Sequence, residues 1–552
     1  MRLIRSFSDT GLILGALFFA ASITPSLVPR GYLEQGVLSG FCFAIGYSVG
    51  VFLRWLWAYL ELRVPRSTRR KSIKRALAVV CALAVASSVW FARPWLDTVR
   101  AAMKLPPVDN IFLVRTLLIA LVTFAVLMVI GRVFMWVSLD VAYRARAWMP
   151  RRVANVIGAG CAALLFSFVA NGVVVHGALR LVNASFRQAD ALIPPDDSAP
   201  TAPLISGSPR SLIDWDKLGK AGREFAVTAP DAAEIARFTG REALSPIRVY
   251  VGLPAGDSAR ERAHLALKEL LRVGAFSRQA LVIITPTGTG WVDPAAIQSL
   301  EYLYRGNVAS VAMQYSYLPS PLSLMVEPDY GQDASRALFN EIYGYWKTLP
   351  KAQRPKLYLH GLSLGAMNSE RAVNAFEMLG DPINGALWSG PPFPSTHWRT
   401  ITDARNAGSP AWLPEFQDGS LVRFMNQNGT KVPADAPWGP LRIVYLQYAS
   451  DAVTFFDAHD AWRAPAWLDE PRGPDVSPAL RWYPLVSMFQ LALDMLLADT
   501  APMGYGHVYA PSHYVDAWLL VTGIADWPPQ DISRLKQMLD QRRLQAIRAE
   551  RD

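Results

Sequence analysis

One serine stands in a pattern that is typical of a nucleophile. Residues 361–365 read GLSLG, a G-x-S-x-G motif with Ser363 at its centre. An apolar run, Leu357–Leu359, precedes the motif, and a helical pattern follows from about residue 364. In a strand–turn–helix setting the two glycines allow a tight turn that exposes the serine hydroxyl above the sheet. We therefore predict that Ser363 is a catalytic nucleophile rather than part of an ordinary glycine-rich turn.

A serine hydroxyl is a weak nucleophile and needs a base. In one large class of serine hydrolases the triad follows the chain order serine, acid, histidine. Two histidines come late enough to fit: His507, in the glycine-rich stretch MGYGHVY at 503–509, and His513. A flexible loop before the C-terminal helix suits a base that must reach the serine. We predict His507 as the base, with His513 as the alternative.

The acid of a triad should follow a strand that lies between the serine and the histidine. Arg442–Tyr448 is apolar and rich in strand-forming residues, and Asp451 comes directly after it. That is the place expected for a carboxylate that orients the histidine. We predict Asp451 as the acid, with Asp457 and Asp460 as alternatives. A turn or helix-cap role is the competing explanation for Asp451.

A tetrahedral intermediate also needs two backbone N–H donors for its oxyanion. One should come from Leu364, which follows the nucleophile, and the other from a loop after an earlier strand. The stretch TPTGTGW at 285–291 follows the apolar run Ala280–Ile284, and its glycines permit close backbone approach. We predict Thr287 and Gly288 as donors there. A phosphate-binding P-loop is excluded because no Gly-Lys-Ser/Thr follows.

No cofactor or metal is expected. The three cysteines are Cys42, Cys81 and Cys161, so none lies near the motifs described above. His507 and His513 by themselves are weak evidence for a metal site.

Alternating strand and helix patterns begin at about residue 245 and indicate a mostly parallel sheet. The expected strands are Ile247–Leu253, Ala280–Ile284, Asn307–Tyr317, Leu357–Leu359, Ala386–Trp388 and Arg442–Tyr448, and the expected helices are 258–273, 331–348 and one from about 364. Active residues of such sheets lie at the carboxyl ends of the strands. The motifs fall at those positions.

The N-terminal third has a different composition. The whole chain of 552 residues is 51% hydrophobic and 18% charged, with a mean hydropathy of +0.17. Each of five apolar runs approaches or exceeds the roughly 20 residues that cross a bilayer. They cover 11–29, 36–59, 76–92, 111–138 and 153–178. No run carries Asp or Glu in its interior, which favours an anchor over a transporter.

Basic residues predict the orientation of these runs. Thirteen lie in the N-terminal stretch and in the loops after the second and fourth runs, whereas the opposite loops hold four. The positive-inside rule then places the N-terminus in the cytoplasm and everything after about residue 180 outside. The net charge of +10 is thus largely explained by topology, and nucleic-acid binding is not expected. We predict an inner-membrane protein with an external catalytic domain.

The predicted organisation is a transmembrane helical domain over 1–185, a linker over 186–212 rich in Pro, Ser and Asp, and a catalytic domain over 213–552. One apolar helical stretch, 483–499, fits either a lid or a packed helix, and the packed helix is favoured.

The chain resembles the bacterial integral-membrane α/β-hydrolase family, which joins an N-terminal multispan domain to a C-terminal catalytic domain. The matching stretches are TPSLVPR at 24–30, PIRVYVGL at 246–253, TPTGTGWVDP at 285–294, QYSYLPS at 314–320, GLSLGA at 361–366, GALW at 385–388, GPP at 390–392, PRGPDVSP at 471–478 and GHVY at 506–509. The resemblance covers nearly the whole chain and implies a serine-hydrolase fold without naming a substrate. The family pattern leads us to expect a second histidine two residues before His507, where this chain has Tyr505.

Together these features predict a membrane-anchored serine hydrolase that cleaves an ester through Ser363, His507 and Asp451. Its location suggests a membrane lipid or an acylated envelope molecule as substrate. An acyltransferase with the same triad, or a lipid- or partner-binding scaffold without catalysis, stays open as an alternative, and a peptidase is disfavoured. The oligomeric state is left open.

Overall fold

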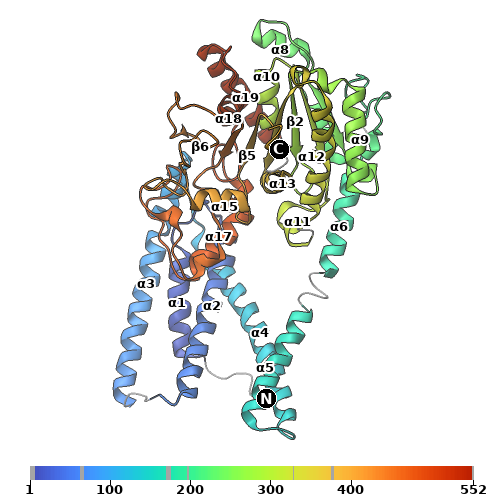
Figure 1. The fold of residues 1–552 in the computed structure, drawn as a ribbon. Coiled ribbons are helices and arrows are strands. Elements are labelled where there is room, and N and C mark those ends of the chain that lie inside the picture. Colours follow the sequence, from blue (N-terminus) through green and yellow to red (C-terminus); the bar gives the residue numbers. More distant parts are fainter. Residues whose placement is uncertain are drawn as a thin grey trace. The chain divides into compact units, whose positions relative to one another are not determined.

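The computed structural model describes residues 7–62, 67–169, 176–194, 198–326, 329–374 and 378–549 (Figure 1). The chain divides into two compact units. A helical unit contains Met1–Leu181 together with Phe456–Pro465 and Pro474–Leu497, and a sheet unit contains Val182–Phe455, Ala466–Gly473 and Ala498–Asp552. The predicted fold class, apolar helices followed by a mostly parallel α/β domain, is confirmed. The chain leaves the sheet unit twice after the last predicted strand, which the predicted boundaries did not anticipate.

The helical unit is built from long apolar helices. Its main helices are α1 (Asp9–Ser22), α2 (Tyr32–Tyr59), α3 (Ser67–Ala102), α4 (Leu113–Ala145) and α5 (Arg151–Phe168). In the described part of the chain, four helices are long and apolar enough to cross a membrane, and they correspond to α2 to α5. Much of their surface is exposed and apolar, as a lipid environment requires.

The first predicted run, 11–29, differs from the expectation. Its helix α1 has 14 residues and ends at Ser22. At 1.5 Å per residue that is about 21 Å, short of the roughly 30 Å hydrocarbon core. Pro25 and Pro29 explain the early end, because proline lacks the N–H that a helix interior needs. The segment 23–31 is non-helical and largely buried.

The other end of the helical region also departs from the predicted boundaries. Helix α5 ends at Phe168, and residues 170–175 of the last predicted run lie outside the described residues. Four of the thirteen basic residues counted for the orientation, Arg2, Arg5, Arg63 and Arg66, also lie outside them. Helix α6 (His176–Ala191) continues into the stretch 186–212 that was predicted as a linker, so the first residues of that stretch are helical.

Small residues let the apolar helices approach closely. A Cβ atom on Gly40 of α2 would lie 2.4 Å from the Ala120 carbonyl oxygen of α4. The same atom on Gly158 of α5 would lie 2.2 Å from the Ser138 carbonyl oxygen of α4. Such contacts are typical of helices that associate in a membrane through backbone packing rather than the hydrophobic effect.

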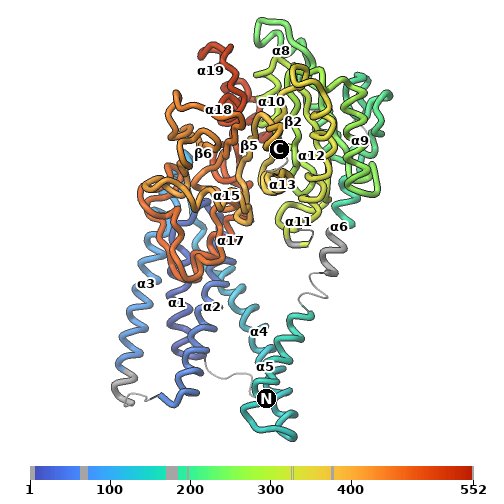
Figure 2. The backbone as a smooth tube through the Cα atoms, in the orientation of Figure 1, coloured from blue at the N-terminus to red at the C-terminus, as the bar shows by residue number. Residues whose placement is uncertain are grey.

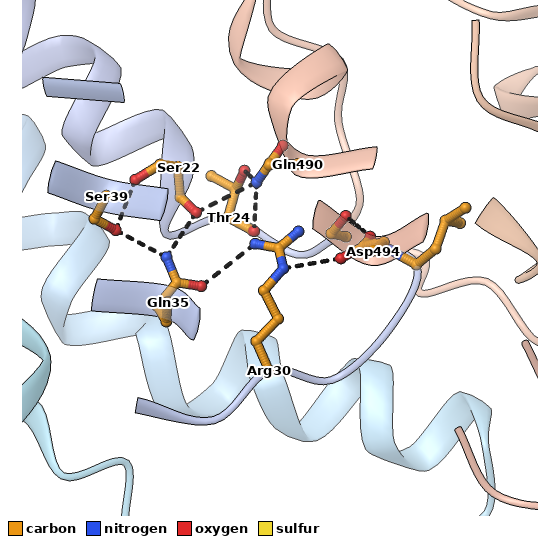
Figure 3. Close-up of polar contacts among 9 residues, drawn as sticks. Ser22, Thr24, Arg30, Gln35, Ser39, Gln490 and Asp494 are labelled. Carbon is orange, nitrogen blue, oxygen red and sulfur yellow. Dashed lines mark hydrogen bonds and ion pairs between the residues drawn. The ribbon is translucent and has the colours of Figure 1, made fainter. Parts of the chain in front are cut away.

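A segment from far along the chain completes the helical unit. Helix α17 (Val486–Leu496) lies within the stretch 483–499, and Val486 packs with Leu38 and Cys42 of α2. Asp494 of α17 is fully buried and forms an ion pair with Arg30, with 2.9 Å between Oδ1 and Nε (Figure 3). The packed-helix interpretation of this stretch therefore agrees with the structure.

The ion pair belongs to a wider network, which Figure 3 draws. Asp494 also accepts hydrogen bonds from the Ser26 hydroxyl and from the Leu27 N–H, the latter at 2.9 Å. Gln490, one turn before Asp494, donates to the Thr24 carbonyl at 3.0 Å. Side chains of α17 thus satisfy two backbone groups of the non-helical segment 23–31, the Leu27 N–H and the Thr24 carbonyl, which helps this segment to be buried.

The sheet unit is organised around one mixed sheet. Among the described residues eight strands form it, in the order β1 (Ile247–Val251), β3 (Val308–Met313), β2 (Ala280–Thr285), β4 (Lys356–Leu362), β5 (Gly385–Ser389), β8 (Arg442–Leu446), β6 (Val422–Asn426) and β7 (Gly429–Thr430). All neighbours are parallel except β6 and β7. Every residue of β1, β2 and β3 is buried, as expected for parallel strands covered on both faces.

Helices pack on this sheet in two groups, which can be followed along the tube in Figure 2. Helix α12 (Tyr330–Thr348) packs against α9 (Ala259–Arg272) and α13 (Leu364–Ala372), and α18 (Pro511–Thr522) packs against α10 (Pro294–Leu303) and α19 (Pro529–Ala549). Shorter helices are α7 (Gly219–Val227), α8 (Ala232–Thr239), α11 (Ser320–Val326), α15 (Thr396–Asp403) and α16 (Ala452–Phe455).

All six predicted strands exist, with ends that differ by a few residues. Strands β6 and β7 were not predicted. The charged Arg423 interrupts the apolar pattern of β6, and its guanidinium is covered by the ring of Trp438, 3.9 Å from the ring centroid. This tertiary contact, invisible in the local pattern, makes the strand compatible with burial.

Candidate active site

Ser363 occupies a strained turn between β4 and α13. Its backbone φ is +56° and ψ is −127°, a region that residues with a side chain rarely adopt. Such a conformation costs on the order of 1–3 kcal/mol and persists only where the surroundings enforce it. The Ser363 N–H donates to the Ser389 carbonyl of the neighbouring strand β5 at 3.0 Å, which fixes the turn.

The two glycines of the motif are required by space. A Cβ atom on Gly361 would lie 2.3 Å from the backbone of Gly365, and one on Gly365 would lie 2.2 Å from the Thr285 carbonyl oxygen. Backbone atoms cannot yield as a flexible side chain can. Since Thr285 ends strand β2, the turn is held between its own strand and a neighbouring one, in the geometry of a nucleophile elbow.

Asp451 and His507 meet directly. Asp451 follows β8 by five residues and is fully buried, and its Oδ2 lies 2.7 Å from Nδ1 of His507. The Val453 N–H donates to the other carboxylate oxygen, Oδ1, at 3.0 Å. This arrangement makes Nδ1–H the donor to the carboxylate and leaves Nε2 as the proton acceptor, which is the tautomer that a general base requires.

A turn after β5 lies between Ser363 and His507. Ser389 accepts the hydrogen bond from the Ser363 N–H, and a Cβ atom on the adjacent Gly390 would lie only 2.7 Å from Cε1 of His507. Ser363 and the imidazole of His507 therefore lie beside the same two residues, Ser389 and Gly390. Among the described residues no group is hydrogen-bonded to the buried Nε2, so the Ser363–His507 hydrogen bond is not formed in this structure. Catalytic hydrogen bonds often tighten when substrate binds.

The surroundings of His507 favour its protonated form. Burial by itself lowers the pKa of the imidazole, but the charge and hydrogen bond of Asp451 outweigh it, so the net effect raises the pKa above its usual value. Asp499 and Asp293 add smaller contributions in the same direction. A raised pKa suits a base that becomes an imidazolium during the reaction.

The alternative residues lie in other settings. Nδ1 of His513 lies 2.6 Å from the Tyr448 hydroxyl, whereas Oδ2 of Asp451 lies 2.7 Å from Nδ1 of His507. Asp457 and Asp460 fall in the segment Phe456–Pro465 of the helical unit. Burial, with help from the charge of Asp457, raises the pKa of Asp460 to about 7, so it is not a dependable anion at neutral pH.

The predicted oxyanion donors differ from one another in availability. Leu364 is the first residue of α13, so its N–H has no acceptor within the helix. The N–H of Thr287 instead donates to the Trp291 carbonyl at 3.0 Å, and that of Gly288 donates to the Ser320 hydroxyl at 3.2 Å. In this structure both loop amides already have partners, because the loop closes on itself and on the start of α11.

Side chains that the sequence reading did not single out hold this loop in place. The Tyr250 hydroxyl donates to the Gly290 carbonyl at 2.7 Å, and the Gln314 amide donates to the Thr289 carbonyl at 3.3 Å. Tyr250 lies within the stretch PIRVYVGL, and Gln314 is the first residue of QYSYLPS. The sequence predicted strands at these stretches and a family resemblance, but no role for either side chain. In the structure both side chains support the loop at 287–290.

Comparison with protein-family models decides the family. The model described as the Alpha/beta-hydrolase family matches residues 247–535, more than half of the chain. The chain belongs to this α/β-hydrolase family. A second model, described as the Alpha/beta-hydrolase family N-terminus, matches residues 23–230. Neither the comparison with curated proteins nor that with solved structures found a match.

The two family matches do not coincide with the two structural units. The hydrolase match, 247–535, includes α17, although α17 folds with the helices of the N-terminal match. The N-terminal match begins at residue 23, at the segment that bonds to Asp494 of α17. In this α/β-hydrolase the network in Figure 3 therefore joins parts of both matched regions within one structural unit.

Proposed function

We propose that this α/β-hydrolase is a membrane-anchored serine hydrolase that cleaves carboxylic esters through Ser363, His507 and Asp451. The observation that carries the proposal is the buried pair of Asp451 and His507, at 2.7 Å, beside the turn that bonds to the strained serine. A strained backbone at a serine costs stability and is typical of functional sites. A buried carboxylate fixes the tautomer of His507, and the described residues offer no hydrogen bond to its Nε2, so this nitrogen can serve as the base that such a serine needs.

The reaction follows from these positions. Nε2 of His507 takes the hydroxyl proton as Ser363 Oγ attacks the ester carbonyl, and Asp451 stabilises the imidazolium that forms. The imidazolium then gives this proton to the leaving alcohol, which leaves an acyl-enzyme. Water then attacks the acyl-enzyme, and Nε2 of His507 takes its proton and passes it to Ser363 Oγ as the acyl–oxygen bond breaks. The carboxylic acid is released and the free serine is restored.

One oxyanion donor is the Leu364 N–H, at the positive end of α13. Thr287 and Gly288 stay candidates for the second donor. Either would have to exchange its present acceptor for the substrate oxygen, which requires the loop at 287–290 to shift when substrate binds.

An active-serine probe tests the function directly. The full-length protein in detergent should be labelled by a fluorophosphonate, and labelling should vanish in Ser363→Ala and in His507→Ala. His513→Ala is the matched control and should keep its labelling, because Nδ1 of His513 contacts the Tyr448 hydroxyl and His507 is the proposed base. Absence of labelling in a folded wild-type protein would favour a scaffold without catalysis.

The apolar helices support a lipidic or acylated envelope substrate. An enzyme anchored by such helices meets amphiphilic esters at a high local concentration. Turnover of purified protein on envelope lipid esters, compared with short water-soluble esters, tests this part. Release of free acid indicates hydrolysis, whereas transfer of the acyl group to an added alcohol acceptor indicates an acyltransferase.

The proposed location is the inner membrane, with the N-terminus in the cytoplasm and the sheet unit on the outer face. The bias of thirteen basic residues against four in the short loops supports this orientation. It requires α1 to cross together with the non-helical segment 23–31. A reporter fused after Asp552 should be active only in an exported form, and cytoplasmic activity would overturn the orientation.

A further inference from the structure

A tyrosine outside the proposed triad shares the triad carboxylate. The Tyr509 hydroxyl donates to Oδ2 of Asp451 at 2.8 Å, the same oxygen that lies 2.7 Å from Nδ1 of His507. We propose that Tyr509 is a positioning residue of the hydrolase site, which holds Asp451 in the orientation that aligns His507. This inference rests on the proposed function, since it assigns Tyr509 a part in the same site.

The local sequence explains how one loop supplies both donors. His507 and Tyr509 are two residues apart in GHVY, with Val508 between them. The turn that precedes them is closed by hydrogen bonds, with the Gly504 N–H donating to the Val508 carbonyl at 2.8 Å and the Gly506 N–H to the Ser450 hydroxyl at 2.9 Å. The second of these bonds fixes the loop to the residue beside Asp451.

The ring of Tyr509 is itself held in place. It stacks on Tyr448 with 4.5 Å between ring centroids and an interplanar angle of 23°. The Tyr448 hydroxyl accepts the Ala510 N–H at 3.1 Å and contacts His513 at 2.6 Å. A hydroxyl on so constrained a ring is already oriented toward its carboxylate, which limits the freedom of Asp451.

Gly390 shows how closely these groups are packed. A Cβ atom there would lie 2.7 Å from Cε1 of His507, 2.9 Å from the Tyr509 hydroxyl and 3.0 Å from Oδ2 of Asp451. Its φ of +49° also disfavours a side chain. Glycine at 390 thus leaves room for the three groups to meet. The stretches GPP at 390–392 and GHVY at 506–509 therefore contribute to the same site.

The charges around the pair decide what Tyr509 does chemically. Burial and the charge of Asp451 raise the pKa of Tyr509 well above its usual value, so its hydroxyl stays protonated and donates throughout the working range. Asp451, Asp499 and Asp293 act on His507, while Asp451, Tyr448 and Tyr514 act on Tyr509. A donor on Oδ2 draws carboxylate charge away from His507 and so limits how far its pKa rises.

The test is Tyr509→Phe in the full chain, which removes the donor and keeps the ring. With the donor lost, Asp451 should stabilise the imidazolium more strongly. The acidic limb of the kcat/KM profile should then move to higher pH by about half a unit to one unit. The less constrained carboxylate should also lower kcat roughly tenfold. KM should change little, because Tyr509 is proposed to act through Asp451 and not on the substrate.

Tyr445→Phe is the matched control. Tyr445 is also fully buried and donates its hydroxyl to a carboxylate, Oε2 of Glu370, at 3.0 Å. Tyr445→Phe should destabilise the protein about as much as Tyr509→Phe does, yet leave the acidic limb of the kcat/KM profile unmoved. An unmoved limb with unchanged kcat in folded Tyr509→Phe, or an equal movement in Tyr445→Phe, would overturn the proposal.

A second measurement avoids any folding defect. Placing 3-fluorotyrosine at position 509 makes the phenol a stronger donor without changing its shape appreciably. The acidic limb should then move to lower pH, opposite to the Phe variant. Movement in the same direction for both changes, or none for fluorotyrosine, would contradict the assigned hydrogen bond.

A measurement that needs no turnover separates this inference from the function. In a Ser363→Ala background, histidine labelled at Cε1 reports the titration of His507 by NMR, with His507→Ala identifying its signal. A higher midpoint on adding Tyr509→Phe supports the inference even if no esterase activity exists. An unchanged midpoint overturns it, whether or not the enzyme turns over.

Discussion

Asp494 and Asp451 are both fully buried, and their partners give them different roles. Asp494, in the helical unit, pairs with Arg30 and accepts from Ser26 and the Leu27 N–H. Asp451, in the sheet unit, lies against His507 and Tyr509. Both carboxylates accept hydrogen bonds from several donors, as a buried polar group requires. The difference lies in whether the partner can change its own charge.

A guanidinium keeps its proton throughout the physiological range, whereas an imidazole gains and loses one there. The pair of Asp494 and Arg30 is therefore permanent, and its consequence is the position of α17. The pair of Asp451 and His507 can alternate between two charge states, which is what proton transfer requires. The same buried carboxylate thus has a structural role in one unit and a proposed chemical role in the other.

The largest expected effect concerns activity in the sheet unit. Asp451→Asn should lower kcat by about 10⁴-fold, because the amide no longer selects the base tautomer of His507. Its thermal midpoint should fall far less than its activity, since the amide keeps much of the hydrogen bonding. The matched change Asp494→Asn should leave most activity in molecules that fold. Comparable losses of kcat in both variants would contradict the division of roles.

The next effect concerns stability in the helical unit. Arg30→Met leaves Asp494 buried without its cation and should destabilise that unit by about 3–5 kcal/mol. Thermal unfolding in detergent, with protease cleavage near α17 as the readout, measures the loss of stability. The double variant Arg30→Met, Asp494→Leu removes both charges and should recover much of it. A double variant no more stable than Arg30→Met would show that the ion pair is not the cause.

The pH dependence tests the electrostatics of His507. Its pKa is raised in the folded protein, and the reaction needs its neutral form. Activity should therefore rise with pH, with a midpoint of kcat/KM above the ordinary histidine value of about 6.5. Asp499→Asn removes one of the charges that raise the pKa and should move the midpoint to lower pH. A midpoint below 6 in the wild type would contradict the contribution of Asp451.

The smallest expected effect concerns the loop at 287–290. Ser320→Ala removes the acceptor of the Gly288 N–H, one anchor among several, and should cost about 1 kcal/mol of loop stability. We expect kcat to fall by less than about tenfold, with KM nearly unchanged, in steady-state assays. A hundredfold loss would show that Ser320 does more than anchor the loop.

Much of the site could be predicted because its residues lie at positions that local sequence patterns mark. A G-x-S-x-G turn after an apolar strand identifies Ser363. The end of the strand at 442–448 suggests Asp451, and the glycine-rich loop before the C-terminal helix suggests His507. Each of these predictions rests on a periodicity of a few residues and on chain order. Parallel strands bring their carboxyl ends to one edge, so local landmarks are enough to propose which residues meet. The triad itself stays a prediction until Ser363 and His507 are tested.

Contacts between distant segments were beyond such reasoning. The sequence by itself determined most of the apolar helices, the positions of six strands along the chain and the glycine-lined serine turn, because these depend on neighbouring residues. Only the tertiary structure decided that Tyr509 donates to Asp451, that Thr287 and Gly288 already have acceptors, and that α17 folds with the helical unit. The physical reason is that a buried polar group must find a partner, and nothing in the local pattern says which distant group will supply it.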